Sequence, residues 1–161
     1  MNKLNLGAGN RPVEGFVNHG RRKHRDEIDI MWDLNELPWP WRDEELGEIH
    51  AMSVLEHLNI DLLQSIDECW RILASGGMLR VRVPYWRHET CWRDPTHRRG
   101  YTMSTFDLFD PSTKAGTEYG FYTECKWKII ECQYIYLKDD FTSIASSVEA
   151  VMRKLDETMA S

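Results

Sequence analysis

The most informative segment of this 161-residue chain is Lys3-Leu4-Asn5-Leu6-Gly7-Ala8-Gly9-Asn10. Its short apolar run, 4–6, meets a Gly-x-Gly turn, which predicts a first strand that runs straight into a loop. Because glycine has no Cβ, the backbone of such a loop can approach a bound group closely. The stretch therefore indicates a ligand-binding loop at the end of the first strand.

Apolar and β-branched runs predict further strands along the chain, at 16–18, 28–32, 49–54, 78–83 and 127–137, the last with an antiparallel partner at 121–124. Apolar residues at helical spacing predict a helix over 62–73, with Asn59 as its N-cap and Gly76-Gly77 as its stop. A similar spacing, from Ile144 to Leu155, predicts a C-terminal helix over 143–159.

Strands alternate with helices, which favours an α/β fold: a Rossmann-like, mostly parallel twisted sheet with helices on its faces, as a single domain over 1–161. The strand at 78–83 alternates apolar residues with Arg80 and Arg82, although buried parallel strands are normally apolar on both faces. One face is therefore expected to be poor in helices. A homodimer contact and a hydrated face are two open explanations.

Composition narrows the class of protein. The formal net charge is −6, which disfavours a nucleic-acid partner despite basic clusters at 21–25 and 97–99. No apolar run approaches the roughly 20 residues of a membrane span, and the start lacks a signal-peptide pattern, so a cytoplasmic location is expected. The four cysteines have no close pairing, and His88, Cys91 and His97 lack a recognised zinc spacing, so no metal is expected.

Several polar or glycine-containing segments directly follow predicted strands: Gly7, Asp33, 54–57 and Pro84-Tyr85. In open α/β sheets, ligands bind beyond the carboxyl ends of the strands. These segments are therefore expected to converge on one edge of the sheet.

The chain resembles the class I methyltransferases that use S-adenosylmethionine, particularly the small bacterial and phage-type branch, over roughly residues 3–102. The resemblance is carried by six segments: Leu4-Asn5-Leu6-Gly7-Ala8-Gly9-Asn10, Gly15-Phe16-Val17-Asn18, Trp32-Asp33-Leu34 with Leu37-Pro38-Trp39, Ser53-Val54-Leu55-Glu56-His57-Leu58, Trp70-Arg71-Ile72-Leu73-Ala74-Ser75-Gly76-Gly77, and Asp94-Pro95-Thr96-His97-Arg98 with Tyr101-Thr102. It implies a seven-stranded sheet with an antiparallel last strand and a cofactor, S-adenosyl-L-methionine, at the strand ends.

The resemblance also implies site residues. Gly7, Ala8, Gly9 and Asn10 would line the amino-acid and ribose parts of the cofactor. Asp33 would accept a hydrogen bond from adenine, with Leu34 beside it, and Val54, Leu55 and Glu56 would lie next to the cofactor. A structural alternative for Asp33 is a turn cap.

One position departs from the family pattern. The family places an acidic residue after the second strand, where it accepts hydrogen bonds from both ribose hydroxyls, and this chain has Gly20 there. Charge-assisted hydrogen bonds are worth about 1.5–3 kcal/mol, so the loss would weaken cofactor affinity by about tenfold or more.

The acceptor side is assigned to the loop region 85–120. Methyl transfer depends chiefly on positioning donor and acceptor, and a general base helps only where the acceptor loses a proton. His97, Asp94 and His57 are the catalytic candidates, although His97 and Asp94 could equally form a structural pair.

The sequence thus favours a methyltransferase acting on a small-molecule or sugar-like acceptor. A catalytically degenerate S-adenosylmethionine-binding module, with a role in binding or assembly, is the alternative. A nicotinamide-dependent oxidoreductase is disfavoured, because Gly7-Ala8-Gly9 lacks the third glycine of the dinucleotide motif.

Overall fold

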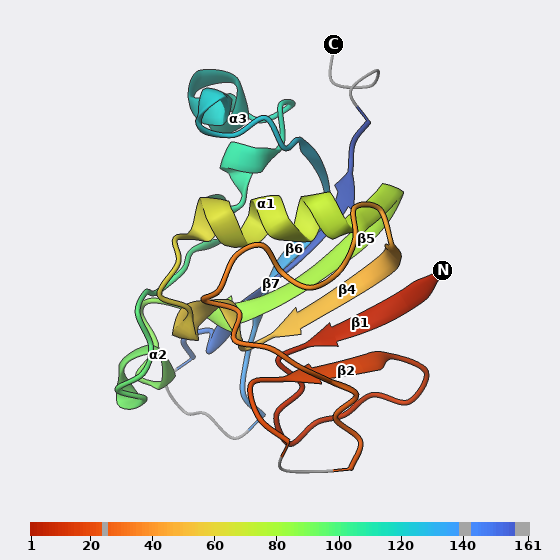
Figure 1. The fold of residues 1–161 in the computed structure, drawn as a ribbon. Helices are drawn as coiled ribbons and strands as arrows, with labels where there is room; N and C mark the ends of the chain where they lie inside the picture. The colour runs from red at the N-terminus through yellow and green to blue at the C-terminus, as the bar shows by residue number, and fades with distance from the viewer. Residues whose placement is uncertain (24–25, 139–142, 157–161) are drawn as a thin grey trace.

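A single seven-stranded sheet runs through the molecule, in the order β3-β2-β1-β4-β5-β7-β6 (Figure 1). The structure is a computed structural model and describes residues 1–23, 26–138 and 143–156. The strands are β1 (Asn2–Leu6), β2 (Val17–Gly20), β3 (Ile30–Met31), β4 (Leu46–Met52), β5 (Leu73–Pro84), β6 (Trp127–Ile135) and β7 (Ser147–Lys154). The first five are parallel, and β7 is antiparallel to both β5 and β6. The predicted mostly parallel sheet with an antiparallel last strand is confirmed.

The helix α1 (Leu62–Ile72) connects β4 to β5 and covers one face of the sheet. It begins at Asp61, whose carboxylate accepts from the backbone N–H of Gln64, while the Gln64 side chain accepts from the N–H of Asp61. This capping box places the N-cap two residues after the predicted Asn59. Of the helices that the structure describes, none is long and apolar enough to cross a membrane.

Short helices and turns fill the long connection between β5 and β6. They are α2 (Thr90–Arg93), the 3₁₀ turns η2 (Met103–Thr105) and η3 (Asp107–Phe109), α3 (Lys114–Tyr119) and the turn η4 (Gly120–Tyr122). A further 3₁₀ turn, η1 (Leu55–His57), follows β4. The predicted strand over 121–124 is wrong, because η4 occupies the first two of these residues and β7 pairs with β6 instead.

The predicted C-terminal helix over 143–159 is also wrong, as far as the described residues extend. Residues 147–154 form β7, which lies between β5 and β6 and forms hydrogen-bonded ladders with both. Val148, Ala150 and Met152 point to one face and are fully buried. The same apolar residues satisfy a helical spacing and a period of two, and pairing on both sides decides for the strand. Residues 157–159 lie outside the described part of the chain.

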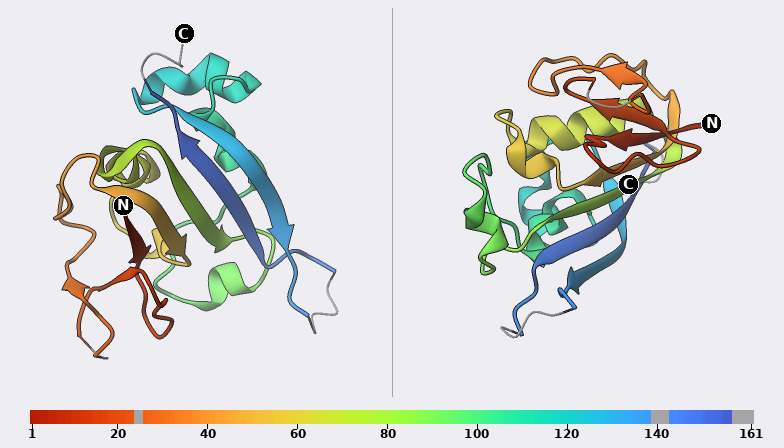
Figure 2. Two further views of the ribbon diagram at one scale, coloured as in Figure 1. Left: turned by 90° about the vertical axis from the view of Figure 1, so that its right-hand side faces the viewer. Right: turned by 90° about the horizontal axis from the view of Figure 1, so that it is seen from below.

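Helices cover only one face of this sheet (Figure 2). In the described part of the chain, the connections β1–β2, β2–β3 and β3–β4 contain no helix. The covered face holds the core, where Leu79, Val81 and Val83 pack with α1 and with Phe106 and Phe109. The prediction of a helix-poor face is therefore confirmed.

The open face is stabilised by charge instead of apolar packing. Glu149 on β7 lies opposite Arg82 on β5, and both Arg82 and Arg80 donate to its carboxylate, Arg80 at 2.9 Å. The Glu149 side chain is only 6% exposed, whereas the two arginines are more than a third exposed. The alternation of polar and apolar residues in β5 thus produces an ion-paired face.

Candidate functional site

The carboxyl ends of β1, β2 and β4 meet around a cleft of about 460 Å³. Its lining comes from three loops that are distant in sequence: Gly7, Gly9, Asn10, Gly20, Arg21, Arg22, Ser53, Val54 and His57. The glycine loop after β1 therefore faces the residues after β4, as the strand-end argument predicts.

Gly7 can only be glycine in this arrangement. Its φ is +65°, and a Cβ would lie 2.5 Å from Cγ2 of Val54. The N–H of Gly7 donates to Nδ1 of the buried His19 at 3.1 Å, so Nε2 of His19 carries the proton and donates to the carbonyl of Trp32 at 3.0 Å. Burial lowers the pKa of His19, which keeps the ring neutral and suited to both bonds. His19 thus fixes the glycine loop relative to Trp32.

A smaller cavity of about 150 Å³ adjoins the cleft and shares Gly7, Arg21, Val54 and His57 with it. Asp33 and Leu34 line this cavity. The carboxylate of Asp33 accepts from the backbone N–H and the side-chain amide of Asn35 and pairs with Arg21 at 2.9 Å, and these bonds lower its pKa. Asp33 therefore caps a turn and also borders the cavity.

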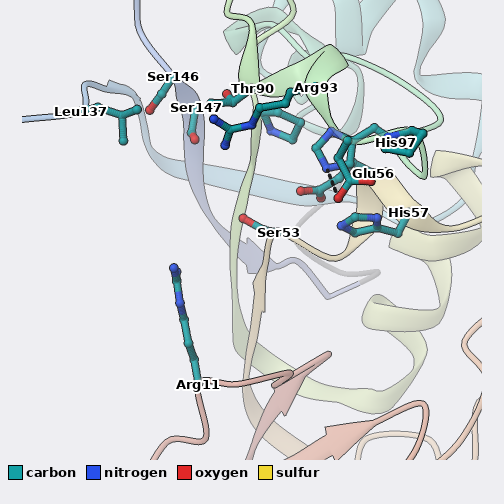
Figure 3. A pocket seen from close by; sticks show the side chains of 13 residues that line it. Arg11, Ser53, Glu56, His57, Thr90, Arg93, His97, Leu137, Ser146 and Ser147 are labelled. Carbon is teal, nitrogen blue, oxygen red and sulfur yellow. Dashed lines mark ion pairs between the residues drawn. The ribbon is translucent and has the colours of Figure 1, made fainter. Parts of the chain in front are cut away.

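A third and larger cavity, of about 740 Å³, lies on the other side of Ser53 and His57, which it shares with the cleft. Figure 3 shows its side chains: Glu56, His57 and His97 point toward one another on one side, while Arg11 extends from another. Of the predicted acceptor region 85–120, it is lined by Thr90, Arg93, Asp94, Pro95 and His97. The three catalytic candidates therefore share one cavity, next to the cleft.

Hydrogen bonds place a proton on Nδ1 of each of the two histidine rings. Nδ1 of His97 lies 2.8 Å from the carbonyl of Cys91, and because a carbonyl only accepts, this nitrogen carries the proton. The hydroxyl of Thr96 donates to Asp94 at 2.7 Å, so it accepts from Nδ1 of His57 at 2.8 Å. In its neutral form, each ring then presents an unprotonated Nε2. The Nε2 of His97 lies 4.0 Å from the Asp94 carboxylate (dashed in Figure 3).

Glu56 lies beneath these rings and is 1% exposed. Its Oε2 is buried and has no hydrogen-bond partner among the described residues. Burial raises the pKa of Glu56 to about 7, and the nearby Asp94 adds to the shift. Burial, together with the adjacent His97, lowers the pKa of His57.

Two of the residues that the resemblance assigned to the cofactor are packed inward. Ala8 and Leu55 are buried, Leu55 in the hydrophobic core, and the N–H of Ala8 donates to the carbonyl of His19. Glu56 lines the larger cavity with His57.

Sequence reasoning missed Ser53 and His19. Ser53 borders two cavities with a φ of +58°, and the predicted strand ran through it. His19 precedes Gly20, the position at which the chain departs from the family pattern. No sequence pattern predicts that the imidazole of His19 is buried beside the glycine loop.

Comparisons with known proteins agree with this architecture. No protein-family model matches the chain, and no curated protein matches it. Solved structures do match: a chain of the Haloferax volcanii complex between the Trm112 methyltransferase activator and a methyltransferase has a TM-score of 0.65 at 14% identity, over 96% of this chain and 83% of that one. An S-adenosylmethionine-dependent methyltransferase from Mesorhizobium loti has a TM-score of 0.65 at 11% identity, over 94% and 90%. The [4+2]-cyclase SpnF has a TM-score of 0.64 at 13% identity, over 96% and 74%.

The chain therefore has the class I fold of S-adenosylmethionine-dependent methyltransferases. Many of its structural neighbours are such enzymes, including one from Archaeoglobus fulgidus.

Proposed function

We propose that this protein is an S-adenosylmethionine-dependent methyltransferase that acts on a small-molecule or sugar-like acceptor. One observation carries the proposal: the cleft beside the glycine loop and the larger cavity meet at Ser53 and His57. A donor in the cleft and an acceptor in the cavity would meet at this junction, and methyl transfer needs the two held next to each other.

In this proposal, Gly7, Gly9, Asn10 and Val54 contact the amino-acid and ribose parts of the cofactor. The adenine ring enters the smaller cavity beside Asp33 and Leu34. The carboxylate of Asp33 is already bonded to Asn35 and Arg21, so its contribution to adenine binding is through one remaining lone pair.

The catalytic residues are His57 and His97, with Asp94 as a positioning residue that holds Thr96 against His57. An acceptor hydroxyl or amine gives its proton to an unprotonated Nε2 as its lone pair bonds to the methyl carbon. The carbon–sulfur bond breaks, and its electron pair stays on sulfur, which leaves neutral S-adenosylhomocysteine.

A second candidate function is a binding module without turnover. The observation that favours it is the cleft wall at the end of β2, where Gly20 is followed by Arg21 and Arg22 and offers no carboxylate to the ribose. Such a module would bind the cofactor weakly and use it for assembly.

Calorimetry with S-adenosylmethionine, S-adenosylhomocysteine and NAD, followed by a turnover assay on a panel of acceptors, separates these functions. We expect binding of the first two and release of S-adenosylhomocysteine with some acceptors. Binding without turnover on any acceptor would support the module, and a preference for NAD would refute both.

A matched pair of variants tests the location of the cofactor. Gly9 and Gly76 both have positive φ, +51° and +69°, so a valine strains the backbone at either position. Gly9 lines the cleft, whereas Gly76 lies in the first part of β5. Gly9→Val should weaken S-adenosylmethionine binding at least tenfold, and Gly76→Val should not. Equal affinities in the two variants would refute the proposed location of the cofactor.

A further inference from the structure

The group formed by Glu56, His57 and His97 has the donor set of a metal site. One ligand atom of each lies within 4.8 Å of the other two. The three come from two segments about 40 positions apart, η1 and the loop after α2, and the rings of the two histidines meet edge to face, with centroids 4.7 Å apart.

The hydrogen bonds around the histidines are those of metal ligands. A metal-binding histidine usually donates its second N–H to a carbonyl, a carboxylate or a similar acceptor, which fixes the tautomer. His97 donates its Nδ1–H to the carbonyl of Cys91. His57 donates its Nδ1–H to the hydroxyl of Thr96, which in turn donates to Asp94. Each ring is thus held with a lone pair available on Nε2.

An independent observation comes from Glu56. Its carboxylate is 1% exposed, and Oε2 has no hydrogen-bond partner among the described residues. A buried carboxylate oxygen costs free energy unless it is paired or coordinates a cation. The two histidine rings occupy the space beside it without donating to it in the tautomers described above.

We propose that Glu56, His57 and His97 bind one divalent transition-metal cation of the Zn²⁺ class. Two imidazole nitrogens and one carboxylate oxygen suit Zn²⁺, and three protein ligands leave a coordination position open. Mg²⁺ prefers an all-oxygen shell and is a poorer match. All three ligand residues line the 740 Å³ cavity, so a molecule in that cavity would be beside the cation.

The cation would bind the acceptor at the junction with the cofactor cleft. With the cation bound, the Nε2 lone pairs of His57 and His97 coordinate it and no longer act as bases. A hydroxyl bound to the cation would instead lose its proton to solvent, because the cation stabilises the resulting oxyanion, which would then attack the methyl carbon. This catalytic role rests on the proposed function, whereas the binding of the cation does not.

Metal binding to the full chain is measured first, without cofactor. Chelator-treated protein is titrated with Zn²⁺ by calorimetry and with Co²⁺ by visible absorption, and its folding is checked by circular dichroism. We expect one equivalent to bind and a Co²⁺ band of low coordination number to appear. Glu56→Gln and His97→Gln should each weaken binding at least tenfold, and Thr96→Val, which releases the ring of His57, by about 10–100-fold.

His50→Gln is the matched control. His50 also lies beside a carboxylate, at 2.7 Å from Glu48, but on the open sheet face. This variant should bind Zn²⁺ as the parent does. A parent chain that binds no Zn²⁺, equal affinity in Glu56→Gln, or an equal loss in His50→Gln would each overturn the site. Zn²⁺ binding without S-adenosylmethionine binding would support the metal site and refute the proposed methyltransferase.

Discussion

Restoring the missing acid at position 20 should raise the affinity for S-adenosylmethionine. Gly20 ends β2 and lines the proposed cofactor cleft, and its φ lies outside the left-handed region, so an L-residue fits its backbone. A Cβ there would contact Arg22 O and two methyl groups of Ile28 at 3.4 Å, which is ordinary van der Waals distance. The substitution Gly20→Asp therefore adds a carboxylate without forcing the backbone to move.

The size of the effect follows from the hydrogen bonds gained. A carboxylate that accepts from both ribose hydroxyls gains about 1.5–3 kcal/mol per bond, less the cost of removing it from water. A net gain of roughly 1.4–2.8 kcal/mol corresponds to about 10–100-fold tighter binding. The neighbouring Arg21 and Arg22 compete with the ribose hydroxyls for the new carboxylate, so we expect a gain in affinity at the lower end of this range.

Calorimetry with S-adenosylhomocysteine, which retains the ribose, measures the effect in the absence of turnover. Gly20→Asn is the control, since it adds similar bulk without charge and should gain less than Gly20→Asp. Unchanged or weaker binding by folded Gly20→Asp would mean that the ribose does not lie beside the end of β2, and the cofactor placement would be wrong.

Two further predictions concern stability. Burial alone would raise the pKa of Asp110, but hydrogen bonds from Ser112, the N–H of Ile129 and the ammonium of Lys128 outweigh it, so its pKa lies below the usual value. At pH 7, Asp110→Asn should lower the free energy of unfolding, measured with urea, by about 1–3 kcal/mol. This difference between parent and variant should shrink as the pH falls below about 4, because the parent carboxylate then becomes protonated. A difference of the same size at pH 2 would contradict the prediction. Glu149→Gln should lower the free energy of unfolding by about 1–3 kcal/mol, because it leaves Arg80 and Arg82 without their counter-charge. Glu48 is more exposed, so Glu48→Gln should cost less, and an equal loss of stability in the two variants would show that the burial of Glu149 does not set the cost.

Local sequence patterns predicted the parts of the fold that depend on local chemistry. The glycine loop follows β1 because Gly7 and Gly9 adopt its positive φ values without strain, and α1 follows from apolar residues at helical spacing. The open, charged sheet face was also predictable, since every second residue of β5 between 79 and 83 is apolar and the arginines lie between them. The cleft at the strand ends then follows from the parallel topology.

Other features were decided by neighbours that the sequence does not reveal. Residues 147–154 fit a helix and a strand equally, and became β7 because β5 and β6 both offer it hydrogen bonds. The cap of α1 is a different case: Asp61 takes the place of the predicted Asn59 because Gln64 completes its capping box, and this spacing is visible in the sequence.

The order of strands and loops from β1 to β5, and the alternation that separates an apolar from a charged sheet face, follow from local sequence alone, because φ restrictions and side-chain periodicity act within a few residues. By contrast, it is the folding of the chain that brings Glu56 and His57 together with His97, which lies 40 positions after His57, around a buried oxygen of Glu56 that has no partner among the described residues. Ligand distances and tautomers depend on groups brought together through space, such as Thr96 and Cys91, and no spacing along the chain encodes them.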